Sequence, residues 1–491
     1  RAAGRPGLAG ADLELHANER GGSARLTLRD GALEFPGVFE QPRLPMQRVD
    51  GRIVWQHGTP AAPDAPAPLS VQVHDLGFAN DDAQGTLNAR WQSGPGDGFG
   101  AGLRYPGSIE MSGRIASGQA ARVARYLPTG IARPAREYVA AAVRGGRVRD
   151  GAFEVRGDLW DFPFLEPGQG VFRITAQAED VTLAYVPDAP GAPSPWPAMR
   201  AVRGELEFDR AAMRIRGAQA QLMGGVELRN VRGGIADMAE EGVLRLDGQA
   251  RGPLADMLRY VGASPVGGWL GGALAEASGT GTADLNLALV MPLDDLTRTT
   301  VRGALQLAGN DVRLQPGTPL LGQARGRVDF SERGLNVVGA RARVLGGEAT
   351  FEGQTGPSGT LRLAGQGMAR AEALFKPGEL PALAALAPLA PQLRGQAPYR
   401  MQLSVGGGAP LELDVSSSLS GLTLDLPAPL GKLSTADWPL RLRVAGAATG
   451  GAPLRWSLDV GEQLKARFEQ GGDGDWRGRA AVGGELPPWP A

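Results

Sequence analysis

An internal repeat is the feature that most constrains the fold of this chain. Residues Val202 to Gly225 return as Ala324 to Gly347, 122 residues further along and without a gap. Eight of the 24 positions are identical, including the two glycines that end each copy. A gap-free repeat of this kind indicates that one structural unit is used more than once.

Each copy has the period of a β-strand. In the first copy, Val202, Leu206 and Phe208 fall on one parity, and charged residues fall on the other. This alternation is typical of a strand with one apolar and one solvated face. The second copy keeps the pattern with Val328 and Phe330.

The second half of each copy predicts a returning strand. After a charged turn at Asp209 and Arg210, Met213 and Ile215 alternate, and the parity changes after Gly217. A glycine at such a change is what a bulge or bend needs. The corresponding apolar residues of the second copy are Leu335 and Val337. We therefore predict that each copy is a curved hairpin with one apolar face.

A second marker sets the length of the module. A proline stands seven residues before a glycine at Pro197/Gly204, Pro319/Gly326 and Pro439/Gly446, so the period is about 120 residues. We predict a mainly β fold, an elongated, curved and twisted antiparallel sheet of repeated modules with short helical insertions. The predicted modules are 1–117, 118–252, 253–366 and 367–491.

Three stretches break the β pattern and predict the helical insertions: 118–145, 253–276 and 368–393. In the first, apolar residues recur at helical spacing, Pro134 suits a first helical turn, and Gly145 and Gly146 are expected to end the helix. Its polar face carries five arginines: Arg122, Arg125, Arg133, Arg136 and Arg144. We interpret these arginines as a solvated helix face in an arginine-biased sequence. The alternative, that they bind lipid phosphates or a charged partner, is kept as a second interpretation.

Composition excludes several classes of protein. The formal net charge is −1, so no bulk field attracts nucleic acid, and no nucleic-acid partner is expected. There is no cysteine, which excludes disulfides and thiolate chemistry. No apolar run reaches about 18 residues, so no membrane span is predicted, and no signal peptide is visible. The chain begins at Arg1, and we interpret it as a fragment or a processed chain.

The sequence offers little chemistry for catalysis. His16, His57 and His74 are the only histidines and are widely spaced, so we expect no triad and no metal site. The acidic pairs, Asp81-Asp82, Glu240-Glu241 and Asp294-Asp295, are interpreted as solvated loop charge. No glycine-rich stretch opens a helix with dinucleotide spacing, and no cofactor is expected. We predict that the protein is not an enzyme.

Several motifs together resemble the YhdP family of the AsmA-like superfamily. The central run Tyr126–Phe164 contains a Tyr-Leu-Pro segment, a helix followed by Gly-Gly, and Asp-Phe-Pro-Phe at 161–164. Ser416–Lys432 is similar to a second signature, and the repeat copies lie between them in the expected order. The resemblance covers roughly residues 10–480.

The resemblance implies a bridge-like lipid-transfer protein made of repeating β-groove units. Such proteins are anchored in the inner membrane by an N-terminal helix, which lies outside this segment, and extend across the periplasm of Gram-negative bacteria. They are implicated in moving phospholipid toward the outer membrane and in its permeability barrier. The implied partners are phospholipid acyl chains, both membranes and envelope proteins.

Three hypotheses remain at this stage. The first is a lipid conduit that carries acyl chains on the apolar face, with these lining residues: Val202, Leu206, Phe208, Met213, Ile215, Val328, Phe330, Leu335 and Val337. The second is a periplasmic β-scaffold that organises envelope proteins and has an interior filled by side chains. An enzyme acting on envelope polymers is the third. The residues named for the conduit could equally pack beneath the helical insertions.

Overall fold

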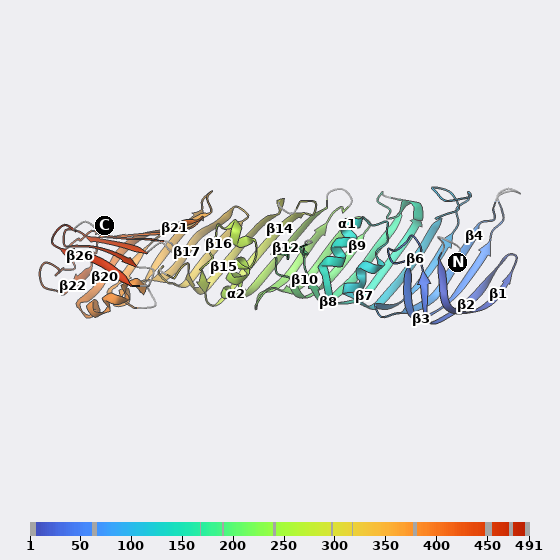
Figure 1. Ribbon diagram of the computed structural model, residues 1–491, viewed down its shortest axis with the longest axis horizontal. Coiled ribbons are helices and arrows are strands. Elements are labelled where there is room, and N and C mark those ends of the chain that lie inside the picture. The colour runs from blue at the N-terminus through green and yellow to red at the C-terminus, as the bar shows by residue number, and fades with distance from the viewer. Residues whose placement is uncertain are drawn as a thin grey trace. The chain divides into compact units, whose positions relative to one another are not determined.

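The computed structural model describes residues 6–60, 66–166, 168–188, 191–238, 242–295, 298–316, 318–376, 381–446, 454–470 and 475–486. The described residues are mainly β, as predicted: 26 strands form one open antiparallel sheet with a few short helices (Figure 1). The alternation of apolar and polar residues accounts for this, because it gives each strand one face to bury and one to hydrate.

The helical insertions lie in the longest connections, and most strands pair with the next strand along the chain. They are β1 (Gly7–Asn18), β2 (Gly21–Glu34), β3 (Arg43–His57), β4 (Leu69–Ala79), β5 (Ala83–Gln92), β6 (Ser108–Gln119), β7 (Val143–Asp158), β8 (Gly170–Leu183), β9 (Met199–Asp209), β10 (Ala212–Gln221), β11 (Glu227–Ile235), β12 (Val243–Pro253), β13 (Ser278–Gly279), β14 (Thr282–Pro292), β15 (Thr300–Arg313), β16 (Leu321–Ser331), β17 (Gly334–Val344), β18 (Gly347–Thr355), β19 (Thr360–Arg370), β20 (Leu393–Gly406), β21 (Ala409–Ser417), β22 (Leu422–Leu424), β23 (Leu440–Gly446), β24 (Arg455–Val460), β25 (Leu464–Gln470) and β26 (Trp476–Val482).

The first helical insertion differs in part from the prediction. Its first piece is the 3-10 helix η1 (Ala120–Tyr126), and its second is α1 (Arg133–Ala142), with a proline in its first turn. The predicted stop at Gly145 and Gly146 is wrong, because β7 already begins at Val143. Gly146 has a φ of +100°, and the register between β7 and β8 shifts here. The two glycines thus bend a strand rather than end a helix.

The other insertions are shorter than predicted. The second contains α2 (Leu254–Gly262) and α3 (Val266–Trp269), followed by turns. In the third, β19 continues to Arg370, and only α4 (Ala371–Leu374) and the 3-10 helix η4 (Pro381–Gln392) follow. A further single turn, η2 (Leu159–Asp161), follows β7. Residues 377–380 of the predicted third insertion lie outside the described residues.

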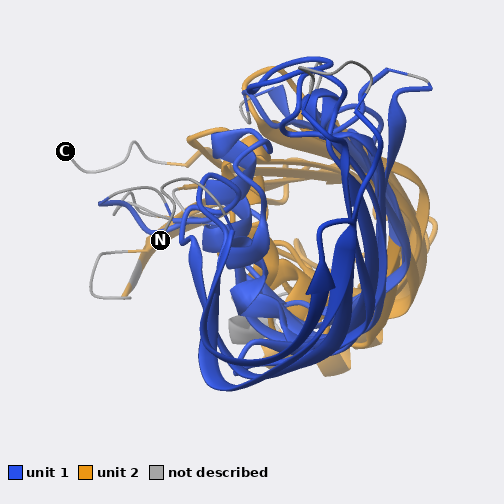
Figure 2. Cartoon of the chain, turned by 90° about the vertical axis from the view of Figure 1, so that its right-hand side faces the viewer, with its two compact units in different colours: residues 1–222, 228–248, 289–299 blue, residues 223–227, 249–288, 300–491 orange. Residues whose placement is uncertain are grey.

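The chain divides into two compact units, coloured separately in Figure 2. Unit 1 comprises residues 1–222, 228–248 and 289–299, and unit 2 comprises residues 223–227, 249–288 and 300–491. In unit 1 the strands curve, and the helical segments of that unit lie on the inner side of the curve (Figure 2). The four predicted modules of about 120 residues remain a prediction.

Both copies of the sequence repeat form the predicted hairpin. The first copy is β9 and β10, and the second is β16 and β17. The predicted bulge at Gly217 is confirmed, since the pairing of β9 with β10 shifts register between Arg216 and Gln219. Gly217 has a φ of +59° and its counterpart Gly339 a φ of +55°, a conformation that favours glycine.

The tertiary contacts explain why a second glycine recurs in both copies. A Cβ built on Gly204 would lie 2.7 Å from Cα of Ala218, and one built on Gly326 would lie 2.7 Å from Cα of Ala340. These glycines also have positive φ values of +152° and +142°. The hairpin therefore closes tightly just beyond its bulge, where no side chain fits.

Candidate functional site

One face of the sheet in unit 1 is apolar from strand to strand. The register places these apolar residues directly opposite one another: Leu76 and Leu87, Ala89 and Met111, Phe153 and Ile174, Ile174 and Phe208, Ala176 and Leu206, Leu206 and Ile215, and Phe208 and Met213. Cross-strand neighbours of this kind stabilise a sheet through contact between their side chains. The apolar face therefore runs across β4 to β10 without a polar row.

Many side chains on this face are only partly covered, although Val155 and Phe172 are buried there in a cluster with Phe164. Leu87, Met111, Phe153, Leu206 and Phe208 are all half-buried, in contrast to the buried side chains of β2 and β3. The latter are Leu26, Leu28, Leu44, Met46 and Val49, which form a buried cluster with Leu76 of β4. Between β5 and β10 the face thus combines one small buried cluster with apolar side chains that keep accessible surface.

Unit 2 continues the same alternation but differs in exposure along its strands. Val328 lies opposite Leu305 and Val337, and Phe330 lies opposite Leu335. Val328, Phe330 and Val337 are half-buried. On β18 to β21 the corresponding side chains are buried: Ala349, Phe351, Leu361, Leu363, Met401, Leu403 and Leu413. This part of unit 2 is a packed core.

The structure brings the nine predicted lining residues onto apolar faces within their units. Val202, Leu206, Phe208, Met213 and Ile215 lie on β9 and β10 and are half-buried. In the second copy, Leu335 is buried at 8% exposure, whereas the other three are half-buried. Eight of the nine thus keep accessible surface; whether they contact lipid stays a prediction.

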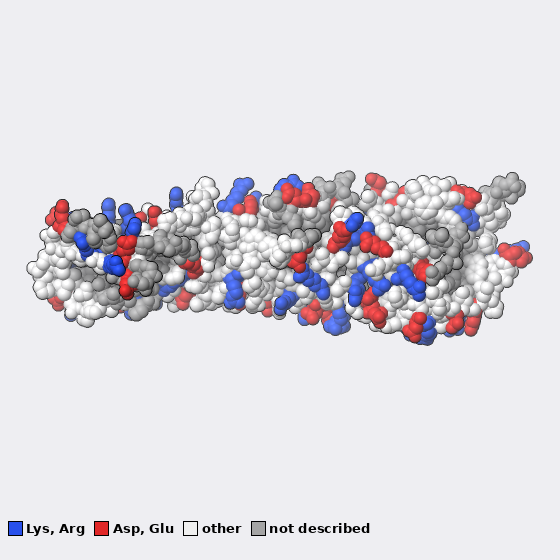
Figure 3. Space-filling model, viewed as in Figure 1, with Lys and Arg blue, Asp and Glu red and all other residues white. Residues whose placement is uncertain are grey.

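The opposite face of the sheet is polar. A pocket of about 540 Å³ opens on it, lined by Thr86, Asn88, Ser112, Arg114, Glu154, Arg173 and Thr175 among others. Nearby, the buried carboxylate of Glu207 pairs with Arg173 at 2.7 Å and with Arg216 at 2.7 Å. The side of the molecule that carries α1, seen in the view of Figure 1 and Figure 3, also has acidic and basic side chains interspersed. The pocket therefore opens mainly among polar side chains of the solvated face, although Leu87, Gly113 and Phe153 also line it.

The first helical insertion packs on the apolar face of unit 1. Tyr126, at the end of η1, contacts the buried cluster of β2 and β3. A Cβ on Gly130, between η1 and α1, would lie 3.2 Å from the ring of Phe162. That ring belongs to the 161–164 motif and packs on Phe172, with centroids 5.1 Å apart. The insertion thus reaches from η1 to the motif after β7.

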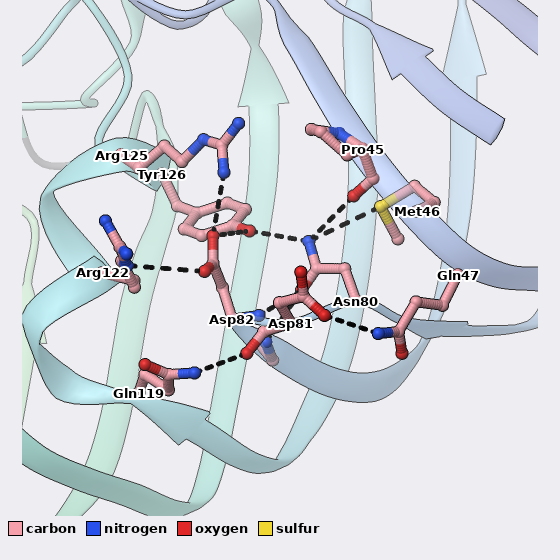
Figure 4. Close-up of polar contacts among 11 residues, drawn as sticks. Pro45, Met46, Gln47, Asn80, Asp81, Asp82, Gln119, Arg122, Arg125 and Tyr126 are labelled. Atoms are coloured by element: carbon pink, nitrogen blue, oxygen red, sulfur yellow. Dashed lines mark hydrogen bonds and ion pairs between the residues drawn. The ribbon is translucent and has the colours of Figure 1, made fainter. Parts of the chain in front are cut away.

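Asp82 anchors this insertion to the turn between β4 and β5 (Figure 4). Its carboxylate accepts hydrogen bonds from Tyr126 Oη at 2.9 Å and from Arg125 Nη1 at 3.1 Å. Asn80 donates to Tyr126 Oη at 2.8 Å and accepts from the backbone N–H groups of Asp82 and Ala83. The interpretation of Asp81-Asp82 as solvated charge is therefore wrong for Asp82, which is buried among these partners.

We expect the alkaline stability of the protein to depend on Tyr126. Burial, together with the bond to Asp82, raises its pKa from 10.0 to about 12. The contribution of the neutral Tyr126 hydroxyl to the free energy of unfolding is complete below pH 10. It is lost as the pH rises to about 12, because in that range the tyrosine of the unfolded state loses its proton before the tyrosine of the folded state does. Urea unfolding between pH 9 and 12 should show a steeper loss of stability for the wild type than for Tyr126→Phe. Parallel curves for the two proteins would contradict this.

The arginines of the insertion are held by carboxylates. The ion pairs are Arg122–Asp82, Arg125–Asp82, Arg133–Glu137, Arg136–Glu40 and Arg144–Asp188. Asp188 accepts a hydrogen bond from the backbone N–H of Ser194 and lies 2.7 Å from Arg144, and these two contacts hold the pKa of its carboxyl below the usual range. Each of the five arginines thus has a carboxylate partner within the chain.

The described residues hold no cluster of three or more acidic, histidine or cysteine side chains that could bind a metal ion. His16, His57 and His74 are all exposed, on separate strands. Asp294 and Asp295 both pair with Arg298. Glu240 and Glu241 lie outside the described residues. The described part of the chain contains no helix long and apolar enough to span a bilayer.

Comparison with known proteins agrees with the sheet and its motifs. Residues 1–484 match the family model described as YhdP protein. The chain belongs to the YhdP family. No curated protein and no solved structure matched the chain.

Sequence reasoning identified the apolar parity but missed two features of this YhdP-family chain. It did not connect Asp82 with Tyr126, because 44 residues separate them and only the tertiary fold brings them together. It also missed that many glycines on the apolar face lie opposite aromatic residues, as Gly113 lies opposite Phe153. The register between strands, which a single sequence does not reveal, carries that information.

Proposed function

We propose that this chain is a lipid conduit in which the half-buried apolar faces of the sheet carry the acyl chains of phospholipids. The observation that carries the proposal is the apolar face across β4 to β10, whose side chains are in register and many of which, such as Leu87, Phe153 and Leu206, are partly accessible. Headgroups remain in solvent in this arrangement, so no cluster of free cations is needed.

The energetics favour a surface of this kind. Burial of acyl chains is worth about 0.8 kcal/mol per CH₂, so two chains of about 16 carbons cost on the order of 25 kcal/mol to pass through water. An apolar face removes most of this barrier. Movement along it requires similar affinity at each strand, and the repeated hairpin provides similar surfaces at β9–β10 and β16–β17.

Membership of the YhdP family supports the proposed setting through what the resemblance implies. We propose that the chain acts in the periplasm, held to the inner membrane by a helix outside this segment, and moves phospholipid between the inner and outer membranes. Support for the outer-membrane permeability barrier would follow from that activity. Envelope proteins are proposed as further partners.

Site-specific photo-crosslinking tests the proposal. A photoreactive residue at Ile215 or Val328, on the apolar faces, should crosslink phospholipid from vesicles of phosphatidylethanolamine and phosphatidylglycerol. The same residue at Gln177 or Val338, exposed on the other face, provides the matched control. Equal labelling of the two faces, or none on the apolar faces, would rule out the conduit.

A scaffold that organises envelope proteins is the second candidate. The buried side chains of β18 to β21 favour it, since this part of unit 2 has the filled interior that a scaffold requires. Mass spectrometry of lipid extracted from the purified chain separates the candidates. Bound phospholipid supports the conduit, whereas lipid-free protein together with absent crosslinking supports the scaffold.

A further inference from the structure

Aromatic side chains on the apolar faces lie over glycines of the neighbouring strand. Phe153 is directly opposite Gly113, and Phe330 is directly opposite Gly303. A Cβ built on Gly303 would lie 2.2 Å from Cζ of Phe330, and one on Gly113 would lie 2.4 Å from Cζ of Phe153. The far end of each ring therefore occupies the space that a side chain on the opposite strand would take.

This arrangement changes the height of the ring above the sheet. Side chains on a strand normally stand roughly perpendicular to the sheet. A ring whose end reaches the neighbouring glycine must instead lie across the strands, and such aromatic–glycine pairs are a known way of stabilising glycine in sheets. Phe153 and Phe330 are half-buried, so each residue keeps accessible surface.

The pair Gly303 and Phe330 in unit 2 shows most clearly that the ring takes the space of a side chain on the opposite strand. All three atoms nearest to a Cβ on Gly303 belong to the Phe330 ring, at 2.2, 2.5 and 2.8 Å. No positive φ is recorded for this glycine, so the backbone does not require it. At Gly113, in contrast, the carbonyl oxygen of Thr86 also lies at 2.6 Å. The space taken by the ring is therefore the reason that position 303 lacks a side chain.

We propose that these glycines determine the depth of the lipid path. Because Gly303 and Gly113 have no side chain, the rings lie flat and protrude little above the sheet. The apolar face then has room for flexible acyl chains lying along it. A side chain at either glycine would lift the ring into the space of the acyl chain. This inference rests on the proposed conduit and assigns the glycines as positioning residues, since they act through the rings.

The test uses the full chain with a photoreactive residue at Leu305, which shares the face with Gly303. The probe is vesicles of phosphatidylethanolamine and phosphatidylglycerol with 16-carbon chains. Crosslinking should fall in the order Gly303, Gly303→Ala and Gly303→Val, by about tenfold for the last. Removal of the ring in G303V/F330A should restore it. In G303F/F330G the phenylalanine and the glycine exchange strands, so the aromatic–glycine pair is kept. Crosslinking should be retained in this variant, which tests the role of the pair even if G303V folds poorly.

The outcomes separate this inference from the proposed function. If the wild type crosslinks lipid and folded G303V does so equally, the glycines do not set the depth, and the conduit stands. Loss of crosslinking in a folded G303F/F330G, or no recovery in a folded G303V/F330A, also overturns the inference. If the wild type itself fails to crosslink at Leu305, Ile215 and Val328, the conduit fails, and the inference fails with it.

Discussion

Val337→Asp will reduce phospholipid crosslinking at Val328 by about 100-fold. Val337 lies directly opposite Val328 on the apolar face, so its carboxylate would meet the acyl chain at that point. A charged side chain in contact with hydrocarbon costs about 2.5–3.5 kcal/mol on insertion scales, which corresponds to roughly that factor. The measurement is the yield of the lipid adduct by mass spectrometry.

The neighbouring residue provides a matched control. Val338 is 47% exposed, points to the other face and lies opposite Arg327. Val338→Asp makes the same chemical change one residue away, and its carboxylate would face a guanidinium. We expect crosslinking at Val328 to remain within about twofold of the wild type. Equal losses in the two variants would mean that the face of the sheet is irrelevant.

Leu206→Asp extends this prediction to unit 1. Leu206 lies directly opposite Ile215, so a photoreactive residue at Ile215 reports on it. We expect the same large loss, because both copies of the hairpin present the same apolar row.

The second large effect concerns stability. Gly326→Ala should destabilise the protein by about 3 kcal/mol or more, because its φ of +142° strains any other residue and its Cβ would lie 2.7 Å from Cα of Ala340. Urea unfolding measures the change. The control is Gly262→Ala, at the end of α2, where a Cβ would meet nothing within 4 Å. A control as destabilised as Gly326→Ala would contradict the explanation by close approach.

The sequence of this chain was sufficient for the hairpins, their bulge and their apolar parity. A period of two needs no knowledge of distant contacts, and Gly217 marks the parity change locally. Helical spacing identified the first insertion as well. It did not distinguish the 3-10 helix η1 from an α-helix, since apolar residues three and four apart suit both. It also assigned Gly145 and Gly146 to a helix end, although contact with β8 makes them a bend in β7.

Tertiary structure alone decided how much of each apolar row is accessible. Val328 and Met401 both occupy apolar positions of an alternating strand, yet the first is half-buried and the second is 3% exposed. The physical reason is that alternation fixes the direction of a side chain relative to its own strand, whereas burial depends on which distant strands and helices come to cover it. The repeat therefore determined the apolar faces by itself. The fold decided where they remain accessible to a ligand and where they form a packed core.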